Sequence, residues 1–155
     1  FQAVPYGQLG TIAGGRVYFE AAISKCHTVN SVFAGKNYNS LPRTDIIYTH
    51  CDDDGVLIEA AVNAGAQGII YAGSGMGSIH CGAEAALLKA MQRGAAVVRS
   101  TRVSEGRVLA ANPKWDEAGF ICGGNLNPQK ARILLQLALT CTKDTKKIQE
   151  IFDEY

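Results

Sequence analysis

From about Thr44 onward, short apolar runs alternate with longer stretches in which apolar residues recur with helical spacing. The short runs predict strands at residues 46–50, 68–72, 95–99 and 119–122. The longer stretches predict helices at residues 56–64, 81–92 and 127–140, and a last helix that begins after Thr142 or Asp144. Because the predicted strands lack strict alternation of apolar and polar residues, both faces of the sheet are expected to be covered. The order strand–helix–strand therefore predicts an α/β fold, a three-layer α/β/α arrangement of the Rossmann or flavodoxin type around a small parallel sheet.

The first part of the chain has a different pattern. Two β-prone runs, at residues 11–13 and 16–19, flank a Gly-Gly pair, which is a two-residue signal for a β-hairpin. Asn, Ser and Pro in residues 37–43 indicate a connector. We therefore predict an interdomain linker with a β-hairpin at residues 1–44 and an α/β domain at residues 45–155.

Composition and charge narrow the range of partners. The 155 residues carry a formal net charge of +1, so no excess of basic side chains is present to neutralise a nucleic-acid backbone. No apolar stretch approaches the roughly 18 to 20 residues that a membrane-spanning helix needs. Abundant Ile, Val, Leu and Ala, with few charges, exclude a disordered chain. We predict a globular protein that binds neither nucleic acid nor a membrane.

The five cysteines form no clear disulfide or metal pattern. Their odd number leaves at least one unpaired within the chain, and no Cys-x-x-Cys occurs. Cys26, Cys51 and Cys81 each adjoin a histidine. Adjacent residues on a strand point to opposite faces, however, so each such pair can offer only one ligand. Buried or half-buried small side chains are the favoured interpretation, and we expect neither a metal nor a cofactor.

The glycine-rich segment at residues 73–78 lies after a predicted strand and before a predicted helix, the place of a dinucleotide-binding loop. Its glycines, Gly73, Gly75 and Gly77, follow a G-x-G-x-G spacing instead of G-x-G-x-x-G. No Gly-Lys-Ser/Thr follows, so neither nucleotide fingerprint is met. Two interpretations stay equally open: backbone that a ligand or partner approaches closely, and a tight turn between strand and helix.

Polar residues follow two other predicted strands. Ser100 is a candidate nucleophile by position only, because no Gly-x-Ser-x-Gly surrounds it. Arg102 could pair with a carboxylate ligand or with an internal Asp. The acidic run at residues 52–54 could gather a cation, but three consecutive side chains cannot all face one ion. We therefore favour a helix N-cap with acidic residues that suit the helix dipole.

The helix predicted at residues 127–140 has a clear start. Asn127 is expected to cap it, and Pro128 occupies its first position. Lys130 and Arg132 follow in the first turns, where cations oppose the helix dipole. We expect them to pair with a carboxylate or to face an interface, with structural pairing favoured.

Several runs share one resemblance. They are YGQLG at residues 6–10, GII at 68–70, AGSGMGS at 72–78, VVRSTRV at 97–103, LNPQKARILLQLALT at 126–140 and IQEIFDEY at 148–155. The long run at 126–140 is the most specific. Together they resemble the C-terminal domain, with its linker, of the L-asparaginase/glutaminase family, in particular the bacterial type II and fungal enzymes. The resemblance covers essentially the whole chain.

The resemblance implies part of an amidohydrolase that converts L-asparagine to L-aspartate and ammonia, in a protein of roughly twice this length. In that family the nucleophilic threonine lies in a larger N-terminal domain whose motifs are absent here, so no catalytic residue is expected in this chain. The start at Phe1 rather than at a Met is expected either from a removed leader or from a chain that is part of something longer, and the second fits the resemblance. Implied partners are the catalytic N-terminal domain, further copies in a homotetramer, and a small amino-acid substrate. Type II members imply a secreted or periplasmic location.

The resemblance also implies substrate contacts. In the family tetramer this domain reaches into a neighbour's active site with a polar residue of the glycine loop and with a carboxylate, both near the substrate's amino group. The polar residue falls at Met76, or at Ser78 two positions later. The carboxylate falls near Asn112, where no acid stands. Asp116 and Glu117 are close, and an insertion or deletion in the loop could bring either into place. The remaining matched residues are expected to be structural or to face interfaces: Gly73, Gly75, Gly77, Arg102, Asn127, Lys130 and Arg132.

Met76 and Asn112 depart from the family pattern, and this motivates an alternative function. The chain could be a free-standing, non-catalytic module that acts as a secreted binding or interaction protein. A less favoured alternative is a small-ligand or nucleotide binder at the glycine loop. For either of the first two functions we expect an apolar surface where a partner packs, and hence association with itself or with a catalytic domain.

Overall fold

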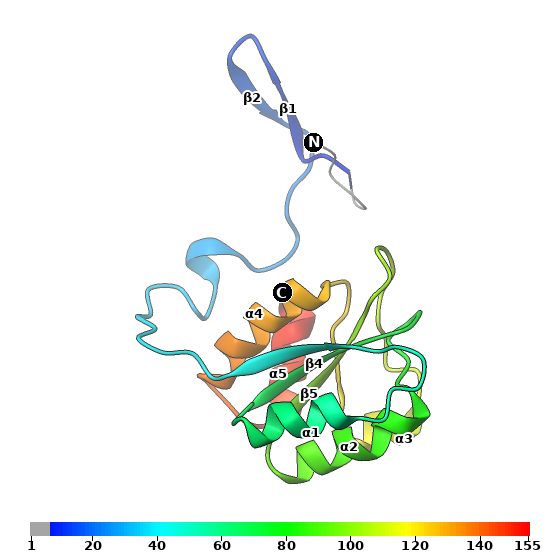
Figure 1. Cartoon of the computed structure of the whole chain (residues 1–155). Coiled ribbons are helices and arrows are strands. Elements are labelled where there is room, and N and C mark those ends of the chain that lie inside the picture. The colour runs from blue at the N-terminus through cyan, green and yellow to red at the C-terminus, as the bar shows by residue number, and fades with distance from the viewer. Residues whose placement is uncertain (1–6) are drawn as a thin grey trace. The chain divides into compact units, whose positions relative to one another are not determined.

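A computed structural model describes residues 7–155, so the first six residues of the predicted linker lie outside the described part of the chain (Figure 1). The described residues form two compact units. One unit is Asn37–Asp153, and the other comprises the residues before Asn37 together with Glu154 and Tyr155. The larger unit holds a parallel sheet, and the smaller holds a hairpin.

The larger unit is built on a parallel sheet with the strand order β3-β4-β5-β6. Its strands are β3 (Thr44–Tyr48), β4 (Gly68–Gly73), β5 (Ala96–Thr101) and β6 (Ile121–Cys122). The register places Ile70 of β4 opposite Ile46 on one side and Val98 on the other. Every residue of β4 and β5 is buried, as central parallel strands covered on both faces require. The predicted parallel sheet is confirmed, and β5 continues to Thr101, beyond its predicted end.

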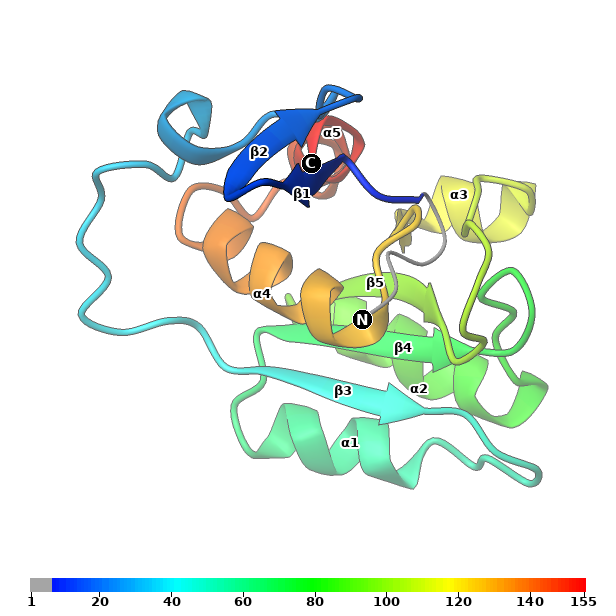
Figure 2. The ribbon, with the colours of Figure 1, turned by 90° about the horizontal axis from the view of Figure 1, so that it is seen from above.

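Helices cover both faces of this sheet (Figure 2). They are α1 (Val56–Asn63), α2 (Cys81–Gln92), α3 (Pro113–Ala118), α4 (Pro128–Leu139) and α5 (Thr145–Glu154). Helices α1 and α2 lie on one face and α4 on the other, which confirms the predicted three-layer α/β/α fold. On the first face, Ile58 of α1 and Leu87 of α2 share a core with Ile69 and Val97 of the central strands. Among residues 7–155, no helix combines the length and the apolar character needed to cross a bilayer.

Helix α3 is not predicted by the apolar pattern, although it starts in the same way as α4. Asn112 accepts a hydrogen bond from Lys114 N at 3.1 Å, and Asn127 accepts one from Lys130 N at 2.9 Å. Each asparagine is followed by a proline at the first helical position. Because α3 has only 6 residues, it is too short to show a helical repeat of apolar positions.

The smaller unit contains the predicted hairpin. Its strands are β1 (Gly10–Ala13) and β2 (Arg16–Phe19), which pair antiparallel. Gly14 and Gly15 turn between them with φ angles of 56° and 75°, the left-handed pair that a type I′ turn requires. A short 3-10 helix, η1 (Thr28–Asn30), follows.

The C-terminal residue belongs to this smaller unit. The hydroxyl of Tyr155 accepts a hydrogen bond from Val32 N at 2.8 Å and donates one to Ser31 Oγ at 2.9 Å. Its ring lies 5.4 Å from that of Phe33, measured between centroids. These contacts anchor the chain end against the segment after η1.

Candidate functional site

The glycine loop after β4 is closed on itself. Ser74 O accepts hydrogen bonds from Gly77 N at 3.0 Å and from Ser78 N at 2.9 Å. A Cβ at Gly73 would overlap Ser78 O, and one at Gly77 would lie 2.9 Å from Ser100 O. By contrast, a Cβ at Gly75 would meet nothing within 4 Å. Two of the three glycines are therefore required by close backbone packing, and the third by its φ of 50°.

The loop is tied to the end of the neighbouring strand. Thr101 Oγ1 donates to Gly75 O, with the two atoms 2.6 Å apart. Arg102 N donates to Gly73 O at 2.9 Å. The carboxyl ends of β4 and β5 thus hold the loop in one conformation, which exposes its tip at the edge of the sheet where α/β proteins commonly bind ligands.

A buried hydrogen-bond network lies beneath this edge. The hydroxyl of Tyr71 lies 2.8 Å from Asp53 Oδ2 and 3.0 Å from Thr49 Oγ1. The tyrosine has a single proton, which the carboxylate accepts, so Thr49 donates to Tyr71 in turn. His80 N also donates to this hydroxyl, at 3.3 Å. Burial raises the pKa of Tyr71, and the bond to Asp53 adds to the rise, which keeps the phenol protonated.

The acidic run at residues 52–54 is organised differently from the prediction. The N-cap of α1 is Gly55, with a φ of 81°, and not an aspartate. Asp54 does serve the helix start, since its Oδ1 accepts from Val56 N at 3.0 Å. Asp53 is buried: its Oδ1 accepts from Gly55 N at 3.2 Å, and its Oδ2 accepts from Tyr71. The bond to Tyr71 is a second role that the predicted N-cap did not include.

A buried guanidinium, that of Arg99, contacts the segments beside β5. Arg99 of β5 is 2% exposed. Its Nη2 donates to Leu109 O at 2.8 Å and to Cys122 Sγ at 3.3 Å. The guanidinium carbon lies 5.0 Å from the centre of the Trp115 ring, within cation–π range. Arg99 therefore joins β5, β6, α3 and the loop before α3 through one side chain.

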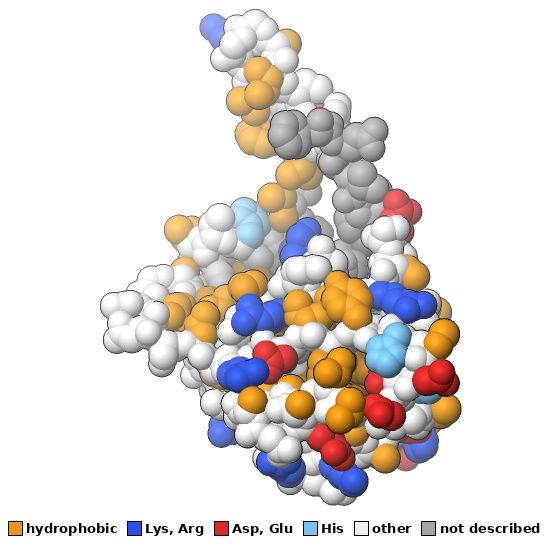
Figure 3. Space-filling model, viewed as in Figure 1, with side chains coloured by type: hydrophobic (Ala, Val, Ile, Leu, Met, Phe, Trp, Pro, Cys, Tyr) orange, Lys and Arg blue, Asp and Glu red, His pale blue; other side chains and the backbone are white. Residues whose placement is uncertain are grey.

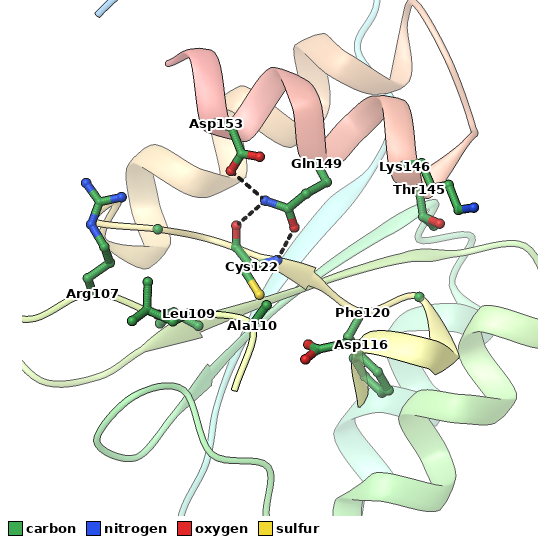
Figure 4. Close-up of a pocket in the computed structure, with 13 residues that line it drawn as sticks. Arg107, Leu109, Ala110, Asp116, Phe120, Cys122, Thr145, Lys146, Gln149 and Asp153 are labelled. Carbon is green, nitrogen blue, oxygen red and sulfur yellow. Dashed lines mark hydrogen bonds between the residues drawn. The ribbon is translucent and has the colours of Figure 1, made fainter. Parts of the chain in front are cut away.

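A cavity of about 320 Å³ opens beside this cluster (Figure 4). Its walls come from the loop before α3, the end of α3, strand β6 and helix α5. Gln149 of α5 accepts from Cys122 N at 2.7 Å and donates to Cys122 O at 3.3 Å and to Asp153 Oδ1 at 3.0 Å. Burial raises the pKa of the Cys122 thiol, and the nearby Arg99 charge opposes the rise only in part.

A second cavity, of about 450 Å³, lies at the carboxyl ends of β3, β4 and β5. Its lining includes Ser74, Arg102 and the side chains of two histidines and two cysteines: His50, His80, Cys51 and Cys81. Within residues 7–155, no three or more His, Cys, Asp or Glu side chains are placed to hold a metal ion.

Comparison with known proteins decides the family. The model of the glutaminase/asparaginase C-terminal domain matches residues 43–152. The chain belongs to this family. It is 45% identical over 155 residues to L-asparaginase 2 of Bacillus subtilis (strain 168), and 41% identical over 157 residues to L-asparaginase 2 of Escherichia coli (strain K12). A crystal structure of a probable cytoplasmic L-asparaginase from Campylobacter jejuni superposes with a TM-score of 0.91 at 45% identity.

The matches cover this chain and only part of each relative. They span 100% of this chain in both L-asparaginases 2, but 41% of the Bacillus protein and 45% of the Escherichia protein. In the Campylobacter structure they span 97% of this chain and 49% of that chain. The chain therefore corresponds to less than half the length of these relatives, namely to their glutaminase/asparaginase C-terminal domain.

The two glycine-loop residues that the family resemblance selected are both exposed. Met76 is 50% exposed, and Ser78 is exposed as well. A thioether is a weak hydrogen-bond acceptor and no donor, whereas a hydroxyl can do both. Of this pair, Ser78 is the side chain that can bind a polar group.

The two candidates for the carboxylate position are already engaged within the chain. Asn112 Oδ1 caps α3 through Lys114 N. Asp116 Oδ1 lies 3.7 Å from Nη2 of Arg99 and lines the cavity of about 320 Å³. The described structure thus brings Asp116 to the Arg99 cluster and not to the glycine loop.

Three of the remaining selected side chains contact backbone groups, namely those of Arg102, Asn127 and Arg132. Arg102 Nη1 donates to Thr49 O at 3.0 Å, and Arg132 Nε donates to Thr44 O at 2.6 Å. Both guanidinium groups therefore bind carbonyl oxygens and not carboxylates. Asn127 caps α4 as expected, and Lys130 is exposed on its first turn.

Ser100 is fully buried, and its hydroxyl donates to Leu126 O at 3.2 Å. This leaves it out of reach of a substrate in solution.

The sequence did not predict the residues that form hydrogen bonds inside the fold. The main ones are Asp53, Tyr71, Arg99 and Gln149. One signal was available for Arg99, which ends an apolar run that was predicted to be a covered strand. A charge at such a position requires buried partners. Gln149 carried no comparable signal, because a glutamine on an amphipathic helix is ordinarily exposed.

Proposed function

We propose that this chain is the C-terminal part of an L-asparaginase-like amidohydrolase that converts L-asparagine to L-aspartate and ammonia. The observation that carries the proposal is the match over the full chain to proteins named L-asparaginase, at 45% and 41% identity. A threonine nucleophile in a preceding N-terminal domain would form the acyl-enzyme and release ammonia. This chain would supply contacts to the substrate from a neighbouring copy.

The chemistry of the described residues supports a nucleophile that lies in another domain. Ser100, the hydroxyl at the end of the central strand, is buried and bonded to a carbonyl group. The acidic Asp53 is bonded to the buried Tyr71 and cannot act as an exposed base. These groups stabilise the fold, and an active nucleophile requires an adjacent base and access to substrate.

Within this proposal, Ser78 makes the contact to the substrate's amino group. Its hydroxyl is exposed on a loop that Thr101 and the packed glycines hold rigid. A rigid loop places a hydrogen-bonding group without a large entropy loss on binding. Met76 would border the substrate without a polar contact, and Asn112 and Asp116 would act through the packing of α3.

We further propose assembly as a homotetramer, which the resemblance implies. The hairpin supports association because its apolar side chains are exposed, with Ile12 and Phe19 each 77% exposed (Figure 3). Exposed apolar side chains gathered on one element are typical of a surface that packs against a partner.

Complementation tests the proposal. The chain would be co-expressed with the part of the Bacillus subtilis relative that lies outside the matched region, and the purified pair assayed for ammonia release from L-asparagine. We expect activity in the pair and none in either part alone. The matched control pairs the same Bacillus part with its own C-terminal part. Activity in the control together with inactivity of the hybrid, when both pairs co-purify, would contradict the proposal.

Two variants of the glycine loop sharpen the test. Ser78→Ala in the active pair should raise KM for L-asparagine about tenfold, the cost of a lost hydrogen bond to a charged group. Ser74→Ala is the matched control, since Ser74 is exposed in the same loop. Equal KM values for the two variants would remove Ser78 from the substrate site.

A non-catalytic interaction module is the second candidate. It is favoured by the nonpolar Met76 and by Asn112, whose side-chain oxygen already caps α3. In that case the chain would not form an active pair with any asparaginase N-terminal part. Failure of the hybrid to co-purify, while the control pair assembles, would favour this candidate.

The proposed location is secreted or periplasmic. It is supported by the family resemblance and by a relative from Haemophilus influenzae that is named a probable periplasmic L-asparaginase, 41% identical over 156 residues. The Campylobacter structure carries the opposite name, cytoplasmic. Fractionation of the source cells tests the proposal, with the protein expected outside the cytoplasm and a cytoplasmic signal as the contrary result.

A further inference from the structure

The cavity of about 320 Å³ beside the Arg99 cluster has the features of a small-molecule site (Figure 4). Its volume lies within the range of natural ligand pockets, at the lower end. Val108, Leu109, Ala110 and Phe120 give it an apolar lining. The cavity does not include the glycine loop, so a ligand here would be separate from the proposed substrate contact.

Asp116 brings a carboxylate to this cavity whose hydrogen-bonding capacity is not used within the chain. Its Oδ1 is buried and has no hydrogen-bond partner among the described residues. The nearest cation, Nη2 of Arg99, lies 3.7 Å away and donates instead to Leu109 O and Cys122 Sγ. A carboxylate in this state is stabilised by an additional donor.

Positive charge is also available on the cavity wall. Arg107 and Lys146 both line it, and neither forms an ion pair with any residue in the described range 7–155. Asp153, the other acid of the lining, accepts a hydrogen bond from Gln149. On this lining, Asp116 therefore has an ion pair with Arg99 but no hydrogen bond at Oδ1, and the two cations have no ion pair within the described range.

Hydrogen bonds hold two walls of the cavity. Gln149 binds both backbone groups of Cys122, so its side chain pairs with the outer edge of β6. Arg99 fixes the opposite wall through Leu109 O. Fixed walls reduce the entropy cost of binding and allow a small ligand to be held by few contacts.

We propose that this cavity binds a small zwitterion, a molecule with one ammonium and one carboxylate group. The ammonium would pair with Asp116, and the carboxylate with Arg107 or Lys146. A simple anion would face Asp116, and a simple cation would face Arg107, Lys146 and the buried Arg99. The zwitterion is the ligand whose charges complement both sides of the cavity.

The experiment is a titration of the 155-residue chain, followed by NMR. The probes are glycine, β-alanine and γ-aminobutyrate, which differ in the spacing of their charges. Propionate and ethylamine serve as controls that carry one charge each. We expect at least one zwitterion to shift the signals of Thr145 and of the Gln149 side chain, with a Kd at least about tenfold lower than either control.

Variants locate the site. Asp116→Asn should weaken binding about tenfold or more, since a charge-assisted bond is lost. Glu117→Gln is the matched control, because Glu117 is exposed on the same helix and does not line the cavity. Arg107→Gln removes an exposed charge from the other side and should also weaken binding, even if Asp116→Asn disturbs the fold. No preference for the zwitterions, shifts confined to the glycine loop, or equal binding by Arg107→Gln and Glu117→Gln would overturn the proposal.

Discussion

The β1–β2 hairpin and the β4–β5 strand pair are both apolar, yet they bury their side chains very differently. Every residue of β4 and β5 is buried. In the hairpin, all residues of β2 are exposed, and Ile12 and Phe19 are each 77% exposed. The difference follows from connectivity. A parallel pair requires crossover helices that then cover the sheet, whereas a two-residue turn brings no covering element.

The comparison separates a unit that completes its own core from a hairpin that leaves its apolar side chains exposed. The parallel sheet and its helices complete their own core, so the larger unit should be stable by itself. The hairpin gains little from its own packing, since an isolated two-stranded hairpin is marginal in water. Mutations should therefore change the stability of the sheet and the association behaviour of the hairpin.

The largest expected effect comes from one added methyl group. Gly73→Ala should lower the free energy of unfolding by about 3 kcal/mol, because its Cβ would overlap backbone atoms of the glycine loop. Gly14→Ala in the hairpin is the control, since a Cβ there meets nothing within 4 Å. It should leave unfolding of the sheet unchanged. Urea titration followed by fluorescence of Trp115, the single tryptophan, reports on the larger unit. Equal losses of unfolding free energy in Gly73→Ala and Gly14→Ala would contradict the difference in packing between the sheet and the hairpin.

Loss of the Tyr71 hydroxyl should lower the free energy of unfolding by less than Gly73→Ala does. Tyr71→Phe removes the donor to the buried Asp53 carboxylate and should destabilise the larger unit by about 2 kcal/mol. Tyr18→Phe in the exposed hairpin should cost less than about 0.5 kcal/mol. The same urea titration measures both. A Tyr71→Phe value within error of that for Tyr18→Phe would show that the network adds nothing to stability.

The same tyrosine gives a pH prediction. Because the pKa of Tyr71 is raised in the folded protein, its contribution to stability is fully present below the ordinary value of 10.0. The contribution is lost as the pH rises through the folded pKa. Unfolding measured at increasing alkaline pH should therefore show a loss that Tyr71→Phe lacks. An identical alkaline profile in the variant is the contrary result.

Glu84 of helix α2 should contribute less to the free energy of unfolding than Tyr71 does. Lys114 and Trp115 hold the pKa of Glu84 below its ordinary value of 4.5 through hydrogen bonds of 2.8 Å and 2.9 Å. Its contribution is therefore present above the unfolded pKa and is lost as the pH falls through the folded pKa. Since Lys114 is exposed, Glu84→Gln should cost less than about 1 kcal/mol at neutral pH. Glu59→Gln, at the longer 3.7 Å pair with Lys89, should cost less still in the same urea titration. A larger loss for Glu59→Gln would contradict this ranking.

The smallest effect on unfolding is expected in the hairpin itself. Phe19→Ser should leave the stability of the larger unit unchanged, because this side chain is exposed. It should nevertheless reduce self-association, measured by sedimentation at increasing protein concentration. Lys25→Ser is a control for a substitution outside the hairpin strands. If Phe19→Ser associates as strongly as the unmodified chain, the hairpin does not take part in self-association.

Local sequence patterns predicted most of the regular structure. Helix α2 has the predicted bounds, and the Asn127-Pro128 start of α4 was found from capping chemistry. The same Asn-Pro start at Asn112 was missed, because α3 is too short to reinforce it with a repeat. Chemistry that follows from capping and periodicity is local, and the sequence reveals it.

Packing over long sequence distances was not predictable in the same way. The three aspartates of residues 52–54 look equivalent in the sequence, yet only Asp53 turns inward to Tyr71. Asp116 was selected as a candidate for the substrate side, but the fold places it beside Arg99. Such contacts depend on which elements lie together in the fold. Local patterns in a single sequence do not predict these long-range contacts.

The central proposal is that this chain contributes to an amidohydrolase without holding its nucleophile within these 155 residues. The most direct measurement is ammonia release from L-asparagine by the purified chain alone, with Ser100→Ala and Ser78→Ala variants in parallel. We expect no release above the buffer rate from any of the three proteins. Release by the unmodified chain that disappears in either variant would contradict it, because a nucleophile within this chain would then perform the reaction.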